Sequence, residues 1–137
     1  MATREELREL AALRLREAET LFGAGFYDGC LYLCGYVVEL ALKAQICSLL
    51  GITEYPDDRM PAAFRTHNFD QLRLLAGLQN EITPDNGALF ANWSIATEWK
   101  PELRYQPAVT TREKAEVTLE AVRGDPNGVF TWLRQRW

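Results

Sequence analysis

The stretch DGCLYLCGYVVELALKAQICSLL, at residues 28–50, is apolar around nearly its whole circumference when it is drawn as a helix. A helix that is apolar on all sides lies either among other helices or in a membrane. Three polar residues, Glu39, Lys43 and Gln45, lie near its middle, where a bilayer would penalise each of them. We therefore interpret residues 28–50 as the central helix of a helical core and expect no membrane span.

Helical patterns continue on both sides of this segment. Before it, Thr3 with Glu6 three residues later predicts a capping box, which opens a helix that ends at the glycines of residues 23–25. After Gly51 we expect a surface loop and then three helices and a short C-terminal one, at residues 68–77, 83–99, 110–123 and 130–137.

Capping signals define two of these later helices. Thr83 followed by Pro84 predicts the start of one, and Thr110 with Glu113 predicts a second capping box. No alternating pattern of apolar and polar residues competes with the helical ones. The sequence therefore predicts an all-α fold, an antiparallel up-down bundle of four to five helices.

Composition indicates one globular domain, residues 1–137, in the cytoplasm. The chain has 137 residues, of which 47% are hydrophobic and 25% charged, which excludes disordered and low-complexity classes. Its first residues, MATREELREL, are rich in charge and contain no secretory signal. The net charge of −4 argues against a protein coated in positive charge for nucleic acid, although a local basic groove is compatible with it.

The three cysteines, Cys30, Cys34 and Cys47, all lie in the apolar segment, and their number is odd. We interpret them as reduced, buried thiols. A zinc site at Cys30 and Cys34 would need two more ligands, and His67 is the single histidine of the chain. We therefore expect no metal and no cofactor.

Glu39 and Lys43 interrupt the apolar segment and are spaced to pair as i and i+4, with Glu first. One interpretation is a pair at the edge of the bundle, with the lysine stem covering apolar surface. The other is a charged position that faces a groove shared by two helices, where a phosphate or a base binds.

The chain has one local basic run, which contains Arg59, Arg65, His67 and Arg73. Arg65 and His67 immediately precede the helix at residues 68–77, whose N-terminus attracts anions. Arg104 and Tyr105 follow Trp99, and an arginine beside an aromatic residue can hold a nucleotide by charge and stacking. The alternative is structural: Arg104 would bind a helix C-terminus or an acid such as Glu39, and Tyr105 would pack.

Four pieces of the chain, taken in order, resemble the HEPN domain family. They are GAGFYDGCLYLCGYVVELALKAQI at residues 23–46, RTHNFDQLRLLAG at residues 65–77, the arrangement of Trp99, Pro101, Arg104 and Tyr105, and an alanine-containing capped helix. The resemblance implies an antiparallel helical bundle, frequent dimers and partnership with minimal nucleotidyltransferases. Many members of the family are RNases in toxin–antitoxin or defence systems.

The nuclease branch of that family carries an arginine followed by a histidine after about four to six residues. Here Arg65 lies two residues before His67 and Arg59 lies eight before it, so neither spacing matches. The resemblance is instead to the minimal branch, in which the ELALKA helix, the RTHN segment and the Arg–Tyr pair recur. Nuclease activity is therefore not implied.

Our hypothesis is a cytoplasmic homodimer that binds nucleotide or RNA as one half of a toxin–antitoxin-like or defence module beside a nucleotidyltransferase. Its ligand side would contain Arg65, His67, Arg104 and Tyr105, with Glu39 and Lys43 behind them. One alternative is a metal-independent RNase with His67 as acid and base and with Arg65 or Arg104 stabilising the phosphorane. The other is a non-catalytic assembly subunit that uses exposed aromatic side chains and the face of the central helix to dimerise.

Overall fold

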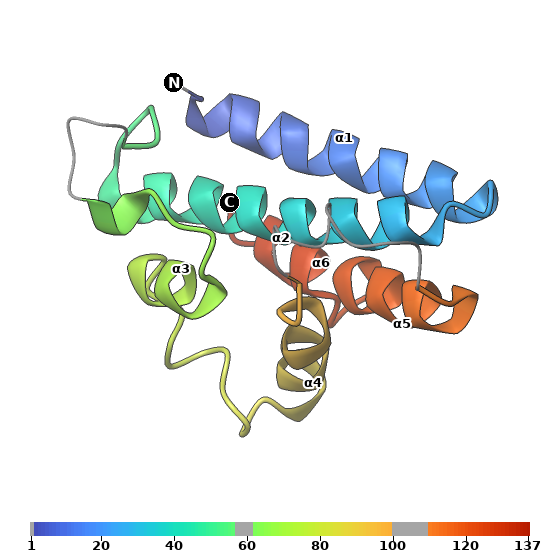
Figure 1. Cartoon of the computed structure of the whole chain (residues 1–137). Coiled ribbons are helices and arrows are strands. Elements are labelled where there is room, and N and C mark those ends of the chain that lie inside the picture. Colours follow the sequence, from blue (N-terminus) through green and yellow to red (C-terminus); the bar gives the residue numbers. More distant parts are fainter. Residues whose placement is uncertain (1, 57–61, 100–109) are drawn as a thin grey trace.

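The computed structural model describes residues 2–56, 62–99 and 110–137, and Figure 1 shows its helices. These residues form six α-helices and one turn of 3-10 helix, and their only strand-like pairing is an isolated bridge between Thr3 and Glu54. The helices are α1 (Arg4–Gly23), α2 (Tyr27–Leu50), η1 (Ala62–Phe64), α3 (Phe69–Leu75), α4 (Gly87–Ala96), α5 (Arg112–Arg123) and α6 (Val129–Arg134). The all-α prediction is confirmed, and α6 is the short C-terminal helix that the sequence predicted near residues 130–137.

The first helix begins where its capping box predicts. The Thr3 hydroxyl accepts a hydrogen bond from the Glu6 N–H at 3.1 Å, and the Thr3 N–H donates to Oε2 of Glu6 at 3.0 Å. These two bonds satisfy backbone groups that a helix start leaves open. In Figure 1, α1 and α2 run side by side in opposite directions, with α1 along the outside of the molecule.

The second helix is the centre of the fold. It contacts each of the other five α-helices, and it ends at Gly51, whose φ of 65° is the left-handed conformation that glycine adopts easily. It is long and apolar enough to cross a membrane, yet more than half of its most apolar stretch is buried inside the protein. That burial is typical of a core helix rather than a membrane span.

A tryptophan packs directly against the backbone of α2. Trp99 is buried, and its ring centroid lies 5.0 Å from that of Tyr36 and 5.8 Å from those of Tyr32 and Phe69. A Cβ added at Gly35 would overlap the Trp99 indole. The small residue at position 35 therefore admits the large side chain of Trp99 against the helix.

Two helix starts differ from the sequence predictions. Helix α4 begins at Gly87 rather than at Thr83, because the Thr83 carbonyl accepts from the Asn86 N–H at 2.9 Å and closes a turn instead. Helix α5 is capped by Thr111, whose hydroxyl accepts from the Lys114 N–H at 3.2 Å. Thr110 does not serve as the cap; its N–H donates to Oδ1 of Asp28 in α2 at 3.0 Å.

The loop after α2 also differs from the surface loop that we expected. Tyr55 and Pro56 are buried, and the Tyr55 N–H donates to the Ala2 carbonyl at 3.0 Å. The Arg4 N–H donates to the Thr53 carbonyl at 2.6 Å. The chain after α2 is thus held against the start of α1, and it carries Tyr55 toward the middle of α2.

Candidate functional site

A carboxylate is buried near the middle of α2. Glu39 is only 3% exposed, among neighbours that are almost all apolar. Burying an ionised carboxylate is costly unless charged or hydrogen-bonding partners compensate it. The surroundings of Glu39 must therefore supply such partners.

Both carboxylate oxygens of Glu39 have a partner. Nζ of Lys43, one helical turn further along α2, lies 3.4 Å from Oε2. Nδ1 of His67, which precedes α3, lies 2.5 Å from Oε1. The i, i+4 pair that the sequence suggested forms, and it lies in the interior rather than at a wet edge of the bundle. We call Glu39, Lys43 and His67 the charged cluster.

The segment that carries His67 is held at several points. The Tyr55 hydroxyl donates to the Phe64 carbonyl at 2.6 Å, and the Asn68 N–H donates to the Thr66 hydroxyl at 2.9 Å. Further along, the Gln71 side-chain amide donates to the Ala63 carbonyl at 3.0 Å. These bonds fix the backbone on both sides of His67 and so hold its imidazole over α2.

The start of α3 supplies no separate anion site. Oδ1 of Asn68 accepts the Gln71 N–H at 2.9 Å, which uses a backbone donor that an anion would need. The helix has only seven residues, so its dipole is small. The sequence-based expectation of an anion site at this helix end is therefore not supported.

Tyr55 packs against the lysine of the cluster. Nζ of Lys43 lies 5.2 Å from the centroid of the Tyr55 ring, a distance typical of a cation–π contact. Burial raises the pKa of the Tyr55 phenol, and its electrostatic interactions with Cys47 and Glu39 raise it further. The phenol therefore remains protonated and keeps its hydrogen bond to Phe64.

Exposure differs sharply within the cluster. The side chain of His67 is 54% exposed, whereas those of Lys43 and Glu39 are 17% and 4% exposed. Across the three described segments of the chain, no protein group bonds Nε2 of His67. A buried carboxylate thus orients an imidazole by Nδ1 and leaves Nε2 toward solvent, an arrangement suited to contacting an anion or transferring a proton.

The other predicted site residues fall into three groups. Arg65 is exposed, two residues before His67. Arg73 is structural: its guanidinium lies 3.3 Å from Oδ1 of Asp70, donates to the Ile82 carbonyl at 3.2 Å and covers the Trp93 ring. Outside the described residues lie Arg59, Arg104 and Tyr105.

The contact between Glu39 and His67 and the role of Tyr55 were not predicted from the sequence. Glu39 and His67 are 28 residues apart, and no periodic pattern connects them. A usable signal did exist, because a carboxylate in an apolar helix needs a partner and the chain has a single histidine.

The thiols lie deep in α2. Cys30, Cys34 and Cys47 are each at most 1% exposed and unoxidised. A hydrogen bond to Cys30 and then burial raise the pKa of Cys34, and burial raises that of Cys47. Across the described part of the chain, no group of three or more His, Cys, Asp and Glu side chains could hold a metal ion.

Comparison with known proteins places this fold in a family. Curated proteins and solved structures gave no match to the chain. The family model of the HEPN domain matches residues 4–124, from the first residue of α1 to the glycine that follows α5. This match covers most of the chain and includes every residue of the charged cluster, so the chain belongs to the HEPN domain family.

Proposed function

We propose that the charged cluster is the phosphate-facing part of a site that binds nucleotide or RNA. The observation that carries this proposal is the buried Glu39 carboxylate, which holds the half-exposed His67 imidazole at 2.5 Å through Nδ1. Burying a charged side chain beneath an exposed imidazole does not improve the packing of the core. The arrangement therefore favours a functional role for the pair.

The charge balance of the cluster supports an anionic ligand. One carboxylate serves two groups, Lys43 and His67, so the cluster carries a net positive charge whenever the imidazole is protonated. The exposed Arg65 adds a fixed charge close by in the sequence. The protein as a whole has a net charge of −4. Positive charge at the charged cluster therefore favours the binding of phosphate at this place without giving the protein a general affinity for nucleic acid.

The sequence adds Arg104 and Tyr105 to the proposed site. The Arg104 guanidinium would bind a phosphate, and the Tyr105 ring would stack on a base. Membership of the HEPN domain family supports a nucleotide- or RNA-related function. On the same ground we propose a cytoplasmic component of a toxin–antitoxin or defence module, with a nucleotidyltransferase as its partner protein.

Binding is tested by titrating the full chain into a fluorescently labelled single-stranded RNA and then competing with ATP. Arg104→Ala and His67→Ala should each weaken binding, with the larger loss at Arg104 if binding is the whole function. Lys114→Ala is the matched control, because Lys114 is exposed and, among the residues that the structure describes, forms its ion pair with Glu98 rather than with the charged cluster. Equal affinity in all four proteins, or no binding at all, would overturn the proposal and favour a non-catalytic assembly subunit.

A second candidate function, an RNase, is favoured by the same contact between Glu39 and Nδ1 of His67. Nε2 would accept the proton of a ribose 2′-hydroxyl as that oxygen attacks the adjacent phosphorus. The bond from phosphorus to the 5′-oxygen breaks, and the imidazole returns its proton to that leaving oxygen. The products would be a 2′,3′-cyclic phosphate and a 5′-hydroxyl, with Arg65 or Arg104 stabilising the charged phosphorane.

Cleavage of a labelled RNA in EDTA separates the two candidates. If the protein only binds, neither the wild type nor any variant cleaves. If it is a nuclease, His67→Ala abolishes cleavage while RNA binding falls only moderately, and Lys114→Ala retains both. Cleavage that persists in His67→Ala would come from another residue or a contaminant and would exclude the mechanism above.

A further inference from the structure

Three aromatic side chains pack together on α2 beside the charged cluster. Tyr32 and Tyr36 are one helical turn apart, both are half-buried, and their ring centroids lie 5.1 Å apart. The Trp99 ring contacts both, with centroid distances of 5.8 Å to Tyr32 and 5.0 Å to Tyr36. We call Tyr32, Tyr36 and Trp99 the aromatic wall.

The aromatic wall adjoins the charged cluster by two routes. Along α2, Tyr36 precedes Glu39 by three residues, which is about 4.5 Å of helix axis, and residues three apart share a face of the helix. Across the fold, Phe69 lies two residues after His67, and its ring centroid is 5.8 Å from that of Trp99. The wall therefore continues the surface of the charged cluster toward the start of α2.

The rings of the wall are fixed at steep angles to one another. The interplanar angle is 73° between Tyr32 and Tyr36 and 67° between Tyr36 and Trp99, so these are edge-to-face contacts rather than parallel stacks. The Tyr32 hydroxyl donates to the Tyr36 hydroxyl at 3.3 Å, and Trp99 fits against α2 because Gly35 has no side chain. The wall is thus ordered in the free protein, which lowers the cost of binding a flat ligand.

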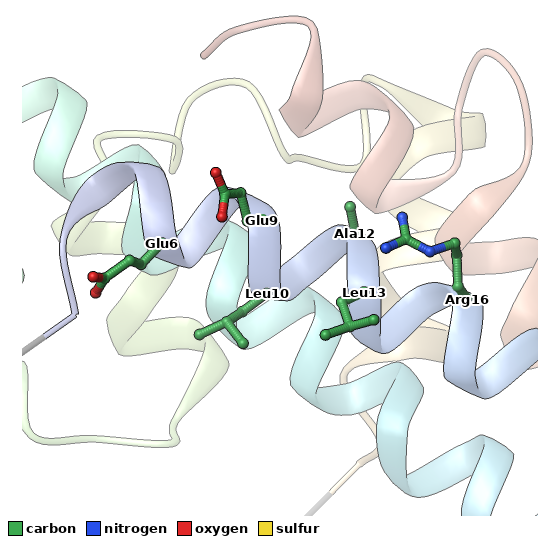
Figure 2. Close-up of a pocket in the computed structure, with 6 residues that line it drawn as sticks. All are labelled: Glu6, Glu9, Leu10, Ala12, Leu13 and Arg16. Atoms are coloured by element: carbon green, nitrogen blue, oxygen red, sulfur yellow. The ribbon is translucent and has the colours of Figure 1, made fainter.

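The hollows on the surface of α1 offer no comparable rings. Figure 2 shows one of about 590 Å³, lined by six residues between Glu6 and Arg16, and a second of about 300 Å³ shares Arg16 and reaches Leu33. Among the described residues that line these hollows, none is aromatic and none belongs to the charged cluster. A base whose phosphate lies at the charged cluster would therefore meet the aromatic wall instead.

We propose that the aromatic wall is a base-binding subsite, where an unpaired base stacks on the rings of Tyr32 and Tyr36 while its phosphate contacts the charged cluster. Stacking accepts every base, since each has a flat π face, but the base must have left the stack of a duplex. The ligand class is therefore a free nucleotide or single-stranded RNA. This inference rests on the proposed function, because the charged cluster supplies the phosphate contact.

Calorimetric titrations of the full chain with ATP and with tripolyphosphate test the subsite, because tripolyphosphate carries the phosphates without a sugar or a base. The wild type should bind ATP more tightly, although charge alone would favour tripolyphosphate. Tyr32→Leu and Tyr36→Leu should each weaken ATP binding at least about fivefold, through the loss of stacking, and should leave tripolyphosphate binding unchanged. Tyr32→Phe and Tyr36→Phe retain the ring and should bind ATP like the wild type.

Tyr27→Leu is the matched control on the same helix. Tyr27 is also half-buried and packs against Phe22 at 5.6 Å, but it precedes Glu39 by twelve residues, about 18 Å along the axis. This variant should leave both affinities unchanged. Thermal melts identify the variants that are folded, and the comparison of the two ligands on the wild type needs no variant.

The subsite is overturned if the wild type binds both ligands equally, or if the folded leucine variants keep their ATP affinity or lose both ligands alike. Phenylalanine variants that lose ATP as the leucine variants do would also exclude stacking. In each of these cases the proposed phosphate site stands as long as His67→Ala weakens the binding of both ligands. A wild type that binds neither ATP nor tripolyphosphate overturns the subsite and the proposed function together.

Discussion

Position 39 combines near-complete burial with a full negative charge, and the fold satisfies that charge through two other residues. Lys43 comes from the same helix, and His67 comes from the segment before α3. Because the lysine and the carboxylate are both mostly shielded from water, removing either one leaves the other without compensation. The charged cluster therefore contributes to stability as well as to the proposed site.

Glu39→Ala should lower the free energy of unfolding by about 1–3 kcal/mol, because Lys43 then lies in the interior without its partner. Urea denaturation monitored by circular dichroism measures the change. Glu116→Ala, at an exposed position of α5, serves as the control and should stay within about 0.5 kcal/mol of the wild type. A similarly small change for Glu39→Ala would show that the pair behaves like one on a wet surface.

At the scale of single elements, α2 leaves no room for a larger residue at Gly35. Gly35→Ala should destabilise the protein by about 1–3 kcal/mol, since the added methyl group overlaps the Trp99 indole. Gly23→Ala makes the same substitution at the end of α1, where the added Cβ would meet no other side chain or backbone of the described structure within 4 Å. This variant should be neutral or slightly stabilising. Equal effects of the two variants on the urea midpoint would contradict this packing.

The thiols of α2 offer a second measurement on that element. Cys30, Cys34 and Cys47 are at most 1% exposed, and the pKa values of Cys34 and Cys47 are raised. We expect a colourimetric thiol reagent at pH 8 to label none of the three within minutes, and all three after unfolding. Rapid labelling of the folded protein would show that α2 opens far more readily than its packing indicates.

Helix positions were largely predictable, because capping signals act over three or four residues. The box of Thr3 with Glu6 and the stop at Gly51 depend on local geometry alone, and both are present. Thr110 failed as a predicted cap because Asp28, 82 residues earlier in the chain, accepts its N–H. The contact of Glu39 with His67 depends on tertiary structure in the same way, so the sequence supplied the residues of the cluster without their arrangement.

At the scale of the whole molecule, burial of titratable groups links stability to pH. Burial is the main cause that raises the pKa of Cys47 above 9.0 and that of Tyr55 above 10.0 in the folded chain. Each group therefore holds its proton more tightly when folded than when unfolded. The stabilisation of the folded state that each group contributes is complete at lower pH, and it is lost as the pH rises above these values.

The free energy of unfolding should thus fall between pH 9 and 11, by up to about 1.4 kcal/mol per pH unit for each group. Urea titrations at half-unit steps of pH measure the slope. Cys47→Ala removes one titrating group and should give a shallower slope. A free energy that stays constant up to pH 11 would contradict the burial of both groups.

The central claim is that Glu39 holds the His67 imidazole where it meets the phosphate of a nucleotide or RNA. Because the chain has a single histidine, its imidazole carbon-bound protons give one assignable set of NMR signals. We predict that ATP or a short single-stranded RNA shifts these signals saturably at constant pH, and that Glu39→Gln reduces the shift and weakens the apparent affinity. Signals that stay unmoved at ligand concentrations well above a millimolar, in a protein that remains folded, would contradict the claim.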